Sequence, residues 1–444
     1  MTWLGLLALI VVLLVLRQSL VLVLAVATAY VHVFIADSKL EFLIQDFWFT
    51  VDREVLLSIP LFMLAGNVMS RGSIAKRLID FMEVLTAPIP GGMGIACVLS
   101  CAAFAAINGS SIVTMLAVGS VMYPALLAQG YTKRFSLGAI ASAGTLGIII
   151  PPSIPLILYG IMTERNIAHL FLAGIGPGLL LTLFFSMYSM GVNWSVPRVK
   201  LDAQRVLRAF YGGIFALLLP VIMIGGIYTG WFSPTESAAV SLAYALLIEF
   251  LVHRDEKAPL APASAGVGQR AVHYLRTRQM KPKDLLETVL ETVRLLATLL
   301  PLLCIAGSLN TILDHSGVPK QLVQVMVGAI EDRWLLMLGI NVLLLIVGCL
   351  MDAGSAILIL APLLEPLAVA KGFDPIHFGI IMITNLEIGY LTPPVGLNLI
   401  VAMAAFKESF GTICRAVVPF IAMMVIWLII IVVWPDLSLF LVGK

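Results

Sequence analysis

Charged residues are scarce in this chain of 444 residues. Asp, Glu, Lys and Arg make up 12% of it and hydrophobic residues 60%, whereas soluble domains carry roughly 25% charged residues. No charged residue occurs between Glu83 and Lys133, and none from Phe135 to Thr163. A helix crosses a bilayer with roughly 20 apolar residues, so these runs predict an all-α polytopic membrane protein. The net charge of +2 gives no indication of a nucleic-acid partner.

Signatures of enzymes are also missing. The chain has no Gly-x-x-x-x-Gly-Lys phosphate loop, so it is not expected to hydrolyse ATP itself. It has no His-Glu-x-x-His and no Gly-x-Ser-x-Gly, which argues against a membrane protease or hydrolase. The cysteines lack metal-site spacing and lie in apolar stretches, so we expect inert thiols: Cys97, Cys101, Cys304, Cys349 and Cys414. We therefore expect neither an enzyme nor a cofactor.

Apolar segments of single-crossing length recur along the chain and predict about ten spanning helices. They cover residues 3–16, 20–35, 55–70, 135–163, 170–192, 210–230, 235–252, 286–313, 376–404 and 412–434. The first of them lacks the basic start and the cleavage site of a signal peptide, so we interpret it as a span. The motif Ser233-Pro234-Thr235-Glu236 predicts a helix start with a capping box.

Two further apolar regions, 93–127 and 334–368, are too long for one crossing. Small polar residues interrupt both, Asn108-Gly109-Ser110-Ser111 in the first and Asp352-Ala353-Gly354-Ser355 in the second. Irregular backbone is tolerated at membrane depth only where protein or a wet cavity covers it. We therefore predict two re-entrant hairpins. An amphipathic helix along the membrane surface precedes each, over 73–86 and 318–333.

The basic residues predict the orientation, because Lys and Arg collect in cytoplasmic loops. With a periplasmic N-terminus and re-entrant hairpins, all but seven of the 27 Lys and Arg residues face the cytoplasm. The seven are Lys39, Arg53, Arg165, Lys320, Arg333, Lys371 and Lys444. Counting the hairpins as full crossings removes this bias.

The two halves repeat each other at an offset of nearly constant length. Pro60 and Pro301, Gly109-Ser110 and Gly354-Ser355, and Pro151-Pro152 and Pro393-Pro394 are matched in order. An odd number of spans separates the copies, which predicts an inverted repeat, the architecture of many secondary transporters. The expected parts are N-terminal scaffold helices and an outer connector (1–54), a first repeat (55–194), connecting scaffold helices (195–252), a cytoplasmic linker (253–285), a second repeat (286–434) and a C-terminal tail (435–444).

Each Pro-Pro pair breaks its helix and removes two backbone donors. The carbonyl groups around 147–150 and 389–392 are therefore expected to lose their intrahelical partners. Oxygen atoms beside a polar hairpin tip can replace the hydration shell of a small cation such as Na⁺. The half-helices that follow direct positive dipole ends at the same space, where they favour an anion. An inert scaffold with kinked helices is the plainer alternative.

The positions of individual polar residues in these segments indicate candidate roles. Asp352 lies at a hairpin tip, where an intramembrane carboxylate is a functional candidate. Glu387 either takes part in transport or only bonds neighbouring backbone. The hydroxyl and amide groups of the same loops are candidates for the solute site: Ser110, Ser111, Ser153, Ser355 and Asn398. For Asn398 a polar contact between helices is the alternative. Asn67, Asn310 and His315 are interpreted as structural.

Several motifs together resemble those of a known transporter family. They are Ser58-Ile59-Pro60-Leu61-Phe62, Asn108-Gly109-Ser110-Ser111, Pro234-Thr235-Glu236, Asp352 in its hairpin, and the run Asn385-Leu386-Glu387-Ile388-Gly389 continuing through Thr392-Pro393-Pro394-Val395-Gly396 to Asn398. From about Leu20 to the C-terminus the chain resembles the large membrane subunit of tripartite ATP-independent periplasmic (TRAP) transporters, the DctM-like permeases. It departs at Arg17-Gln18-Ser19, where a Gly-Val-Pro-type turn is usual, and in its longer linker.

The resemblance implies an elevator-type architecture of the ion-transporter superfamily, driven by a Na⁺ gradient in the bacterial inner membrane. One Na⁺ would lie between Asn108 and the carbonyl groups of Gly147, Ile150 and Pro152. A second would use Asp352, Gly389, Thr392 and Val395. The implied partners are a small four-helix membrane subunit on a separate chain, a periplasmic solute-binding protein and a small organic anion. No particular organic acid is indicated.

Two other functions remain open on the sequence. A stand-alone Na⁺-coupled dicarboxylate carrier of the same architecture would need no binding protein. An intramembrane enzyme or an assembly scaffold would be a different class, but Asp352 and Glu387 lack the nucleophile or metal ligands that an enzyme needs.

Overall fold

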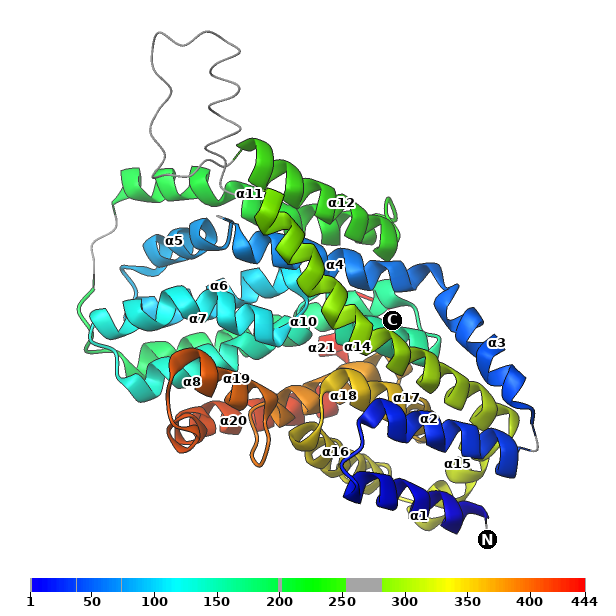
Figure 1. The fold of residues 1–444 in the computed structure, drawn as a ribbon. Helices are drawn as coiled ribbons and strands as arrows, with labels where there is room; N and C mark the ends of the chain where they lie inside the picture. The colour runs from blue at the N-terminus through cyan, green and yellow to red at the C-terminus, as the bar shows by residue number, and fades with distance from the viewer. Residues whose placement is uncertain (1, 37, 73, 199–201, 253–281, 444) are drawn as a thin grey trace, which may run out of the picture.

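The computed structural model describes residues 2–36, 38–72, 74–198, 202–252 and 282–443, and every regular element in that part of the chain is helical (Figure 1). This confirms the all-α prediction. The predicted linker 253–285 falls outside the described residues up to 281. Its last four residues form the start of a helix, and the extent of the linker stays a prediction.

All helices that the sequence predicts for the N-terminal half are present. They are α1 (Thr2–Val15), α2 (Leu20–Tyr30) with a π-helical turn (Val31–Ile35), α3 (Leu40–Val51), a 3₁₀ turn (Glu54–Leu57), α4 (Ser58–Arg71), α5 (Ile74–Thr86), α6 (Gly92–Asn108), α7 (Ser111–Ala128), α8 (Lys133–Gly144), a 3₁₀ turn (Thr145–Ile148), α9 (Ile154–Thr163), α10 (Ile167–Val192), α11 (Ala203–Tyr228) and α12 (Pro234–Leu247) with a π-helical turn (Ile248–Val252). The capping box at Ser233 and Glu236 is present. Helix α3, inside the predicted outer connector, was not predicted.

The C-terminal half repeats the order of the first. Its helices are α14 (Pro282–His315), α15 (Val318–Ala329), α16 (Arg333–Leu350), α17 (Ala353–Ala370), α18 (Pro375–Gly389), α19 (Leu397–Phe406), α20 (Phe410–Val433) and α21 (Asp436–Leu439). The second interruption lies at Met351 and Asp352, slightly before the predicted 352–355, because Asp352 caps α17 and the helix begins at once.

Seven helices of the described chain are long and apolar enough to cross a membrane: α7, α10, α11, α14, α16, α17 and α20. An eighth is counted if Glu54–Arg71 and Ile74–Thr86, which meet at 67°, form one bent span. Several predicted spans are shorter, such as α4 with 14 residues. The chain is thus a polytopic membrane protein, and the count of ten spans stays a prediction.

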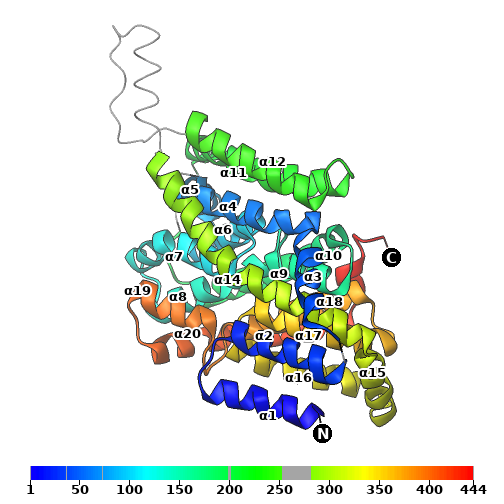
Figure 2. The ribbon, with the colours of Figure 1, turned by 45° about the vertical axis from the view of Figure 1, so that its right-hand side comes forward.

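Two sets of helices are named here, and they also contact each other, most extensively where α5 packs on α6. The first, called the frame here, comprises α2, α3, α4, α5, α11, α12 and α14, in which α12 packs on α4, α11 on α5, and α14 along α2, α3 and α4. Helices α11 and α12 lie at one edge of the molecule and α1 at the opposite edge in both views (Figures 1 and 2). The second, called the inner group, comprises α6–α10 and α16–α20, and it holds both hairpins and both Pro-Pro breaks.

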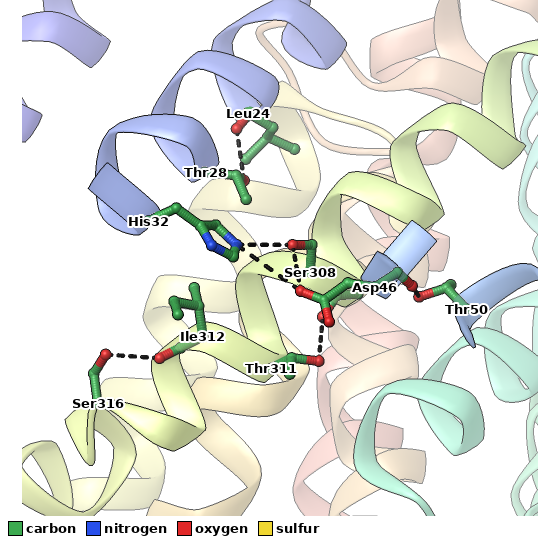
Figure 3. Close-up of polar contacts among 10 residues, drawn as sticks. Leu24, Thr28, His32, Asp46, Thr50, Ser308, Thr311, Ile312 and Ser316 are labelled. Carbon is green, nitrogen blue, oxygen red and sulfur yellow. Dashed lines mark hydrogen bonds and ion pairs between the residues drawn. The ribbon is translucent and has the colours of Figure 1, made fainter. Parts of the chain in front are cut away.

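A buried polar chain fastens the N-terminal helices to α14 (Figure 3). The Ser308 hydroxyl donates to Asp46 Oδ2 over 2.8 Å, so it accepts from His32 Nε2, 3.0 Å away. Asp46 and Thr50 share one face of α3, with the Thr50 hydroxyl bonded to the Asp46 carbonyl oxygen. This polar face is turned toward α14, while Ile44 and Trp48 of α3 are exposed.

Candidate functional site

The tip of the first hairpin packs directly against the first Pro-Pro break. A side chain on Gly147 would collide with the Ser110 carbonyl group, and one on Gly109 with the Pro152 carbonyl oxygen. Gly109 also has φ +65°, a conformation that glycine adopts without steric cost. Both positions therefore need glycine if the tip is to approach the break this closely.

Asn108 closes this tip with its amide group. Its Oδ1 accepts from the Ser110 N–H over 2.7 Å and from the Thr114 hydroxyl over 3.3 Å, and its Nδ2 donates to the Phe104 carbonyl oxygen. The side chain is buried. The amide oxygen is thus fixed at the hairpin tip, and its role as a cation ligand stays a prediction from the family resemblance.

The first break leaves carbonyl groups without donors, as predicted from its two prolines. No donor in the described chain reaches the carbonyl oxygens of Gly147, Ile150 or Pro152, whereas that of Ile148 accepts from the Ser153 hydroxyl over 2.5 Å. The peptide bond between Pro151 and Pro152 is cis, as is the one between Pro393 and Pro394. Oxygen-rich, donor-poor backbone of this kind is suited to a hard cation.

The second hairpin meets the second break in the same way. A side chain on Gly389 would collide with the backbone of Gly348, and the Gly396 N–H donates to the Cys349 carbonyl oxygen over 3.3 Å. The Tyr390 hydroxyl accepts from the Ala353 N–H over 2.9 Å at the hairpin tip. Each hairpin therefore rests on the break of its own half.

The backbone of the second break differs from the prediction at one position. The Gly389 carbonyl oxygen was expected to be unpartnered, but it accepts from the Thr392 N–H over 3.0 Å, because the chain makes a tight turn before Pro393. No donor in the described residues reaches the carbonyl oxygens of Thr392 or Val395. A carbonyl oxygen has two lone pairs, so the Gly389 group retains one for a ligand.

Asp352 is exposed and caps α17. Its Oδ2 accepts from the Ser355 N–H over 2.9 Å, and its Oδ1 accepts from the Ser355 hydroxyl over 2.6 Å. Capping explains why an Asp occurs here without any ion. It leaves lone pairs on both oxygens, so an ion-binding role is compatible with the cap.

The two halves meet through the half-helices that follow the breaks. Helix α19 of the second half packs on the hairpin arm α7 of the first, and α9 of the first half packs on the hairpin arm α17 of the second. At the first of these contacts, Asn398 Nδ2 donates to the Ser111 hydroxyl over 2.6 Å. This exchange of partners is the arrangement that a two-fold relation between the halves produces.

The remaining predicted solute residues serve their own helices. Ser153 is buried and caps α9 through its hydroxyl, and Ser110 caps α7 over 3.5 Å. Ser355 is bonded to Asp352. Only Ser111 and Asn398 join different halves, and the Asn398 Oδ1 has no partner among the described residues.

Comparison of the sequence with known proteins shows the family of the chain. A family model described as "Tripartite ATP-independent periplasmic transporter, DctM component" matches residues 7–437. This chain belongs to that family. It is 38% identical over 397 residues to the C4-dicarboxylate TRAP transporter large permease protein DctM of Pseudomonas aeruginosa, covering 88% of this chain and 86% of that protein.

Other TRAP permeases and one solved fold agree with this. The chain is 35% identical to the DctM of Rhodobacter capsulatus, covering 88% of this chain and 87% of that protein. It is equally similar to the isethionate permease protein DctMQ of Oleidesulfovibrio alaskensis, covering 91% of this chain but only 60% of that protein. The fold resembles the YdaH transporter of Alcanivorax borkumensis with a TM-score of 0.59, 14% identity and coverage of 89% and 87%.

As a TRAP large permease the chain is a membrane transporter subunit rather than an enzyme, as the sequence indicated. Some residues of its site were not predicted. Thr114 holds Asn108, and Tyr390 holds the second hairpin tip. Their positions in the sequence could have indicated them, since Thr114 lies one turn beyond the first tip and Tyr390 lies within the Pro-Pro motif.

Two other polar residues of the permease differ in their contacts. Asn67 donates to the Thr292 hydroxyl inside the frame, as interpreted from the sequence. Glu387 is fully buried next to Thr145, and no backbone donor among the described residues reaches its carboxyl oxygens. The structure thus shows no backbone hydrogen bond to its carboxyl group, and a part for Glu387 in transport stays a prediction.

Proposed function

We propose that this permease imports a small organic anion, driven by a Na⁺ gradient, through an elevator movement of the inner group against the frame. The observation that carries the proposal is the first break. It presents the unpartnered carbonyl groups of Gly147, Ile150 and Pro152 beside the buried amide of Asn108. We assign one Na⁺ to these four residues and a second to Asp352, Gly389, Thr392 and Val395.

Helix N-termini at the breaks support an anionic solute. The hairpin regions 93–127 and 334–368 contain no Lys or Arg, so the positive potential there must come from other groups. An anion bound there would be stabilised by the N-termini of α7, α9, α17 and α19 and by the bound Na⁺. Ser111 and Asn398, bonded to each other where the halves meet, are the side chains assigned to the solute.

The relatives support the class of solute and the partners. Relatives named for C4-dicarboxylates include those of Pseudomonas aeruginosa and Rhodobacter capsulatus, and one from Halomonas elongata is named for ectoine. We therefore propose a C4-dicarboxylate as the first solute to test. We also propose a small membrane subunit on a separate chain, a periplasmic binding protein, and an inner-membrane location with a periplasmic N-terminus.

Uptake by proteoliposomes tests this function. The permease is reconstituted with its small subunit, and uptake of labelled succinate is measured with and without the binding protein and with and without an inward Na⁺ gradient. Uptake that needs both supports the proposal. Uptake without the binding protein would identify a stand-alone carrier, and uptake independent of Na⁺ would contradict Na⁺ coupling.

A further inference from the structure

The C-terminal end of α9 is bonded to the frame as well as to its own segment. The last carbonyl groups of a helix have no intrahelical donor. In α9, which ends at the left-handed Glu164, the carbonyl oxygen of Ile161 accepts from Arg53 Nη1 over 3.0 Å. The next carbonyl oxygen, that of Met162, accepts from Asn310 Nδ2 over 3.5 Å.

These donors come from two different frame segments. Arg53 follows α3, and Asn310 lies in the last turns of α14. Arg53 also faces the carboxylate of Glu164 at 3.6 Å, but both side chains are largely exposed, so this ion pair contributes little. The hydrogen bond to the Ile161 carbonyl oxygen, which places a cation at a helix C-terminus, is the stronger contact.

The contact surface around these bonds is polar and loosely packed. A cavity of about 280 Å³ lies between the frame and the end of α9, and its lining includes Arg53, Asn310, Met162 and Glu164. Asp314 of α14 also lines it. Polar contacts across a roomy cavity separate without exposing a packed apolar core.

Helix α9 connects this contact to the proposed ion site. Its N-cap is Ser153, directly after Pro152, and the helix is only ten residues long. It belongs to the inner group and packs on α17. A movement of the inner group against the frame therefore has to break the bonds of Arg53 and Asn310 to its last turn.

We propose that Arg53 and Asn310 form an outer latch, which holds α9 in the conformation described here and releases it when the inner group moves. They are positioning residues: they set the balance between the two positions of the inner group and touch neither Na⁺ nor solute. This inference rests on the elevator movement of the proposed function.

The test measures that balance in the complete transporter. Spin labels are attached at Trp231→Cys in the frame and Ala128→Cys in the inner group, with Cys349→Ser and Cys414→Ser removing the half-buried thiols. Distance distributions are recorded in liposomes with and without Na⁺ and solute. In the labelled protein with Arg53 and Asn310 unchanged, two populations of label-to-label distance are expected, and one of them matches this structure.

Arg53→Ala is expected to lower the population that matches this structure by about threefold to tenfold, the change that a solvent-screened hydrogen bond to a charged group corresponds to. Asn310→Ala should act in the same direction and less strongly. Arg71→Ala is the matched control, since Arg71 is a similarly exposed frame residue whose partners, Glu287 and Glu291, also belong to the frame. It should leave the populations unchanged.

Two results of the distance measurement would overturn the latch. Either Arg53→Ala and Asn310→Ala both leave the populations as they were, or Arg71→Ala shifts them equally. If Arg53→Ala does not accumulate, an Arg53→Cys, Ile161→Cys pair replaces it: oxidation should stop uptake and reduction restore it, and unchanged uptake would refute the latch. A single population under all conditions would instead refute the elevator movement.

Discussion

Asn398, one turn beyond the second Pro-Pro pair, donates a hydrogen bond of 2.6 Å to the hydroxyl group of Ser111 at the tip of the first hairpin. The two residues are 287 positions apart in the sequence and belong to different halves. Both are buried. The bond therefore joins the two halves at the place where the hairpins and breaks meet.

A double-mutant cycle measures this bond. Asn398→Ala and Ser111→Ala should each lower the uptake efficiency, and the double variant should lose less than the sum of the two, because a buried hydrogen bond contributes about 1 kcal/mol net. The measurement is the initial rate of Na⁺-driven uptake at limiting solute. Strictly additive losses would indicate that the two side chains act separately.

Gly147→Ala should abolish uptake. The added methyl group collides with the Ser110 backbone, which cannot move without displacing the hairpin tip, and overpacking of this kind costs about 1–3 kcal/mol. Gly191→Ala is the control, since a methyl group there meets no atom within 4 Å. Uptake and thermal unfolding of both variants are compared in the same liposomes. Normal uptake by Gly147→Ala would show that the tip does not need to touch the break.

The substitution Asp352→Asn distinguishes the helix-capping role of this side chain from its proposed role in binding Na⁺. Asn caps a helix about as well as Asp, so the unfolding temperature should change little, whereas the loss of the negative charge should weaken the Na⁺ dependence of uptake. Asp332→Asn, at the cap of α16, is the matched control and should change neither property. If Asp352→Asn keeps the Na⁺ dependence of the unaltered protein, Asp352 serves only as a cap.

Glu408 should make part of the stability depend on acid. Its carboxylate, in the loop between α19 and α20, bonds Lys133 over 2.7 Å and accepts from the Tyr123 hydroxyl over 3.1 Å, and the bond to Lys133 lowers its pKa below 4.5. A lowered folded-state pKa contributes stability above the unfolded value of 4.5 that is lost as pH falls below it. Between neutral pH and this range, the thermal unfolding temperature should fall more steeply in the unaltered protein than in Glu408→Gln. Parallel curves would show that the contact carries no stability.

Sequence patterns predicted the broken segments well, for a physical reason. Small polar residues inside a long apolar run and adjacent prolines leave few alternatives in a membrane, so the interruptions at Asn108 and Pro151 were predicted close to where they occur. Helix α3 was missed because Glu41 and Asp46 make 40–51 look like a connector. Only the contact of Asp46 with Ser308 of α14 shows why a charged residue is half-buried on one face there.

The site was predicted less completely than the fold. The unpartnered carbonyl groups of Gly147 and Ile150 follow from proline chemistry, which the sequence contains. The bond from Thr392 to Gly389 and the support of the second tip by Tyr390 depend on how the chain turns in space. Pairings across halves, such as Asn398 with Ser111, depend on tertiary packing that no local pattern encodes.

The most direct test of the account concerns Asn108, whose buried amide oxygen is assigned to a Na⁺. The measurement is the Na⁺ concentration that gives half-maximal uptake in proteoliposomes containing the complete transporter. For Asn108→Ala it should rise at least about tenfold, the equivalent of roughly 1.4 kcal/mol of lost coordination. Asn67→Ala, which loses a bond inside the frame, should leave it unchanged. Equal Na⁺ dependence of the unaltered protein and Asn108→Ala would contradict a Na⁺ site at the first break.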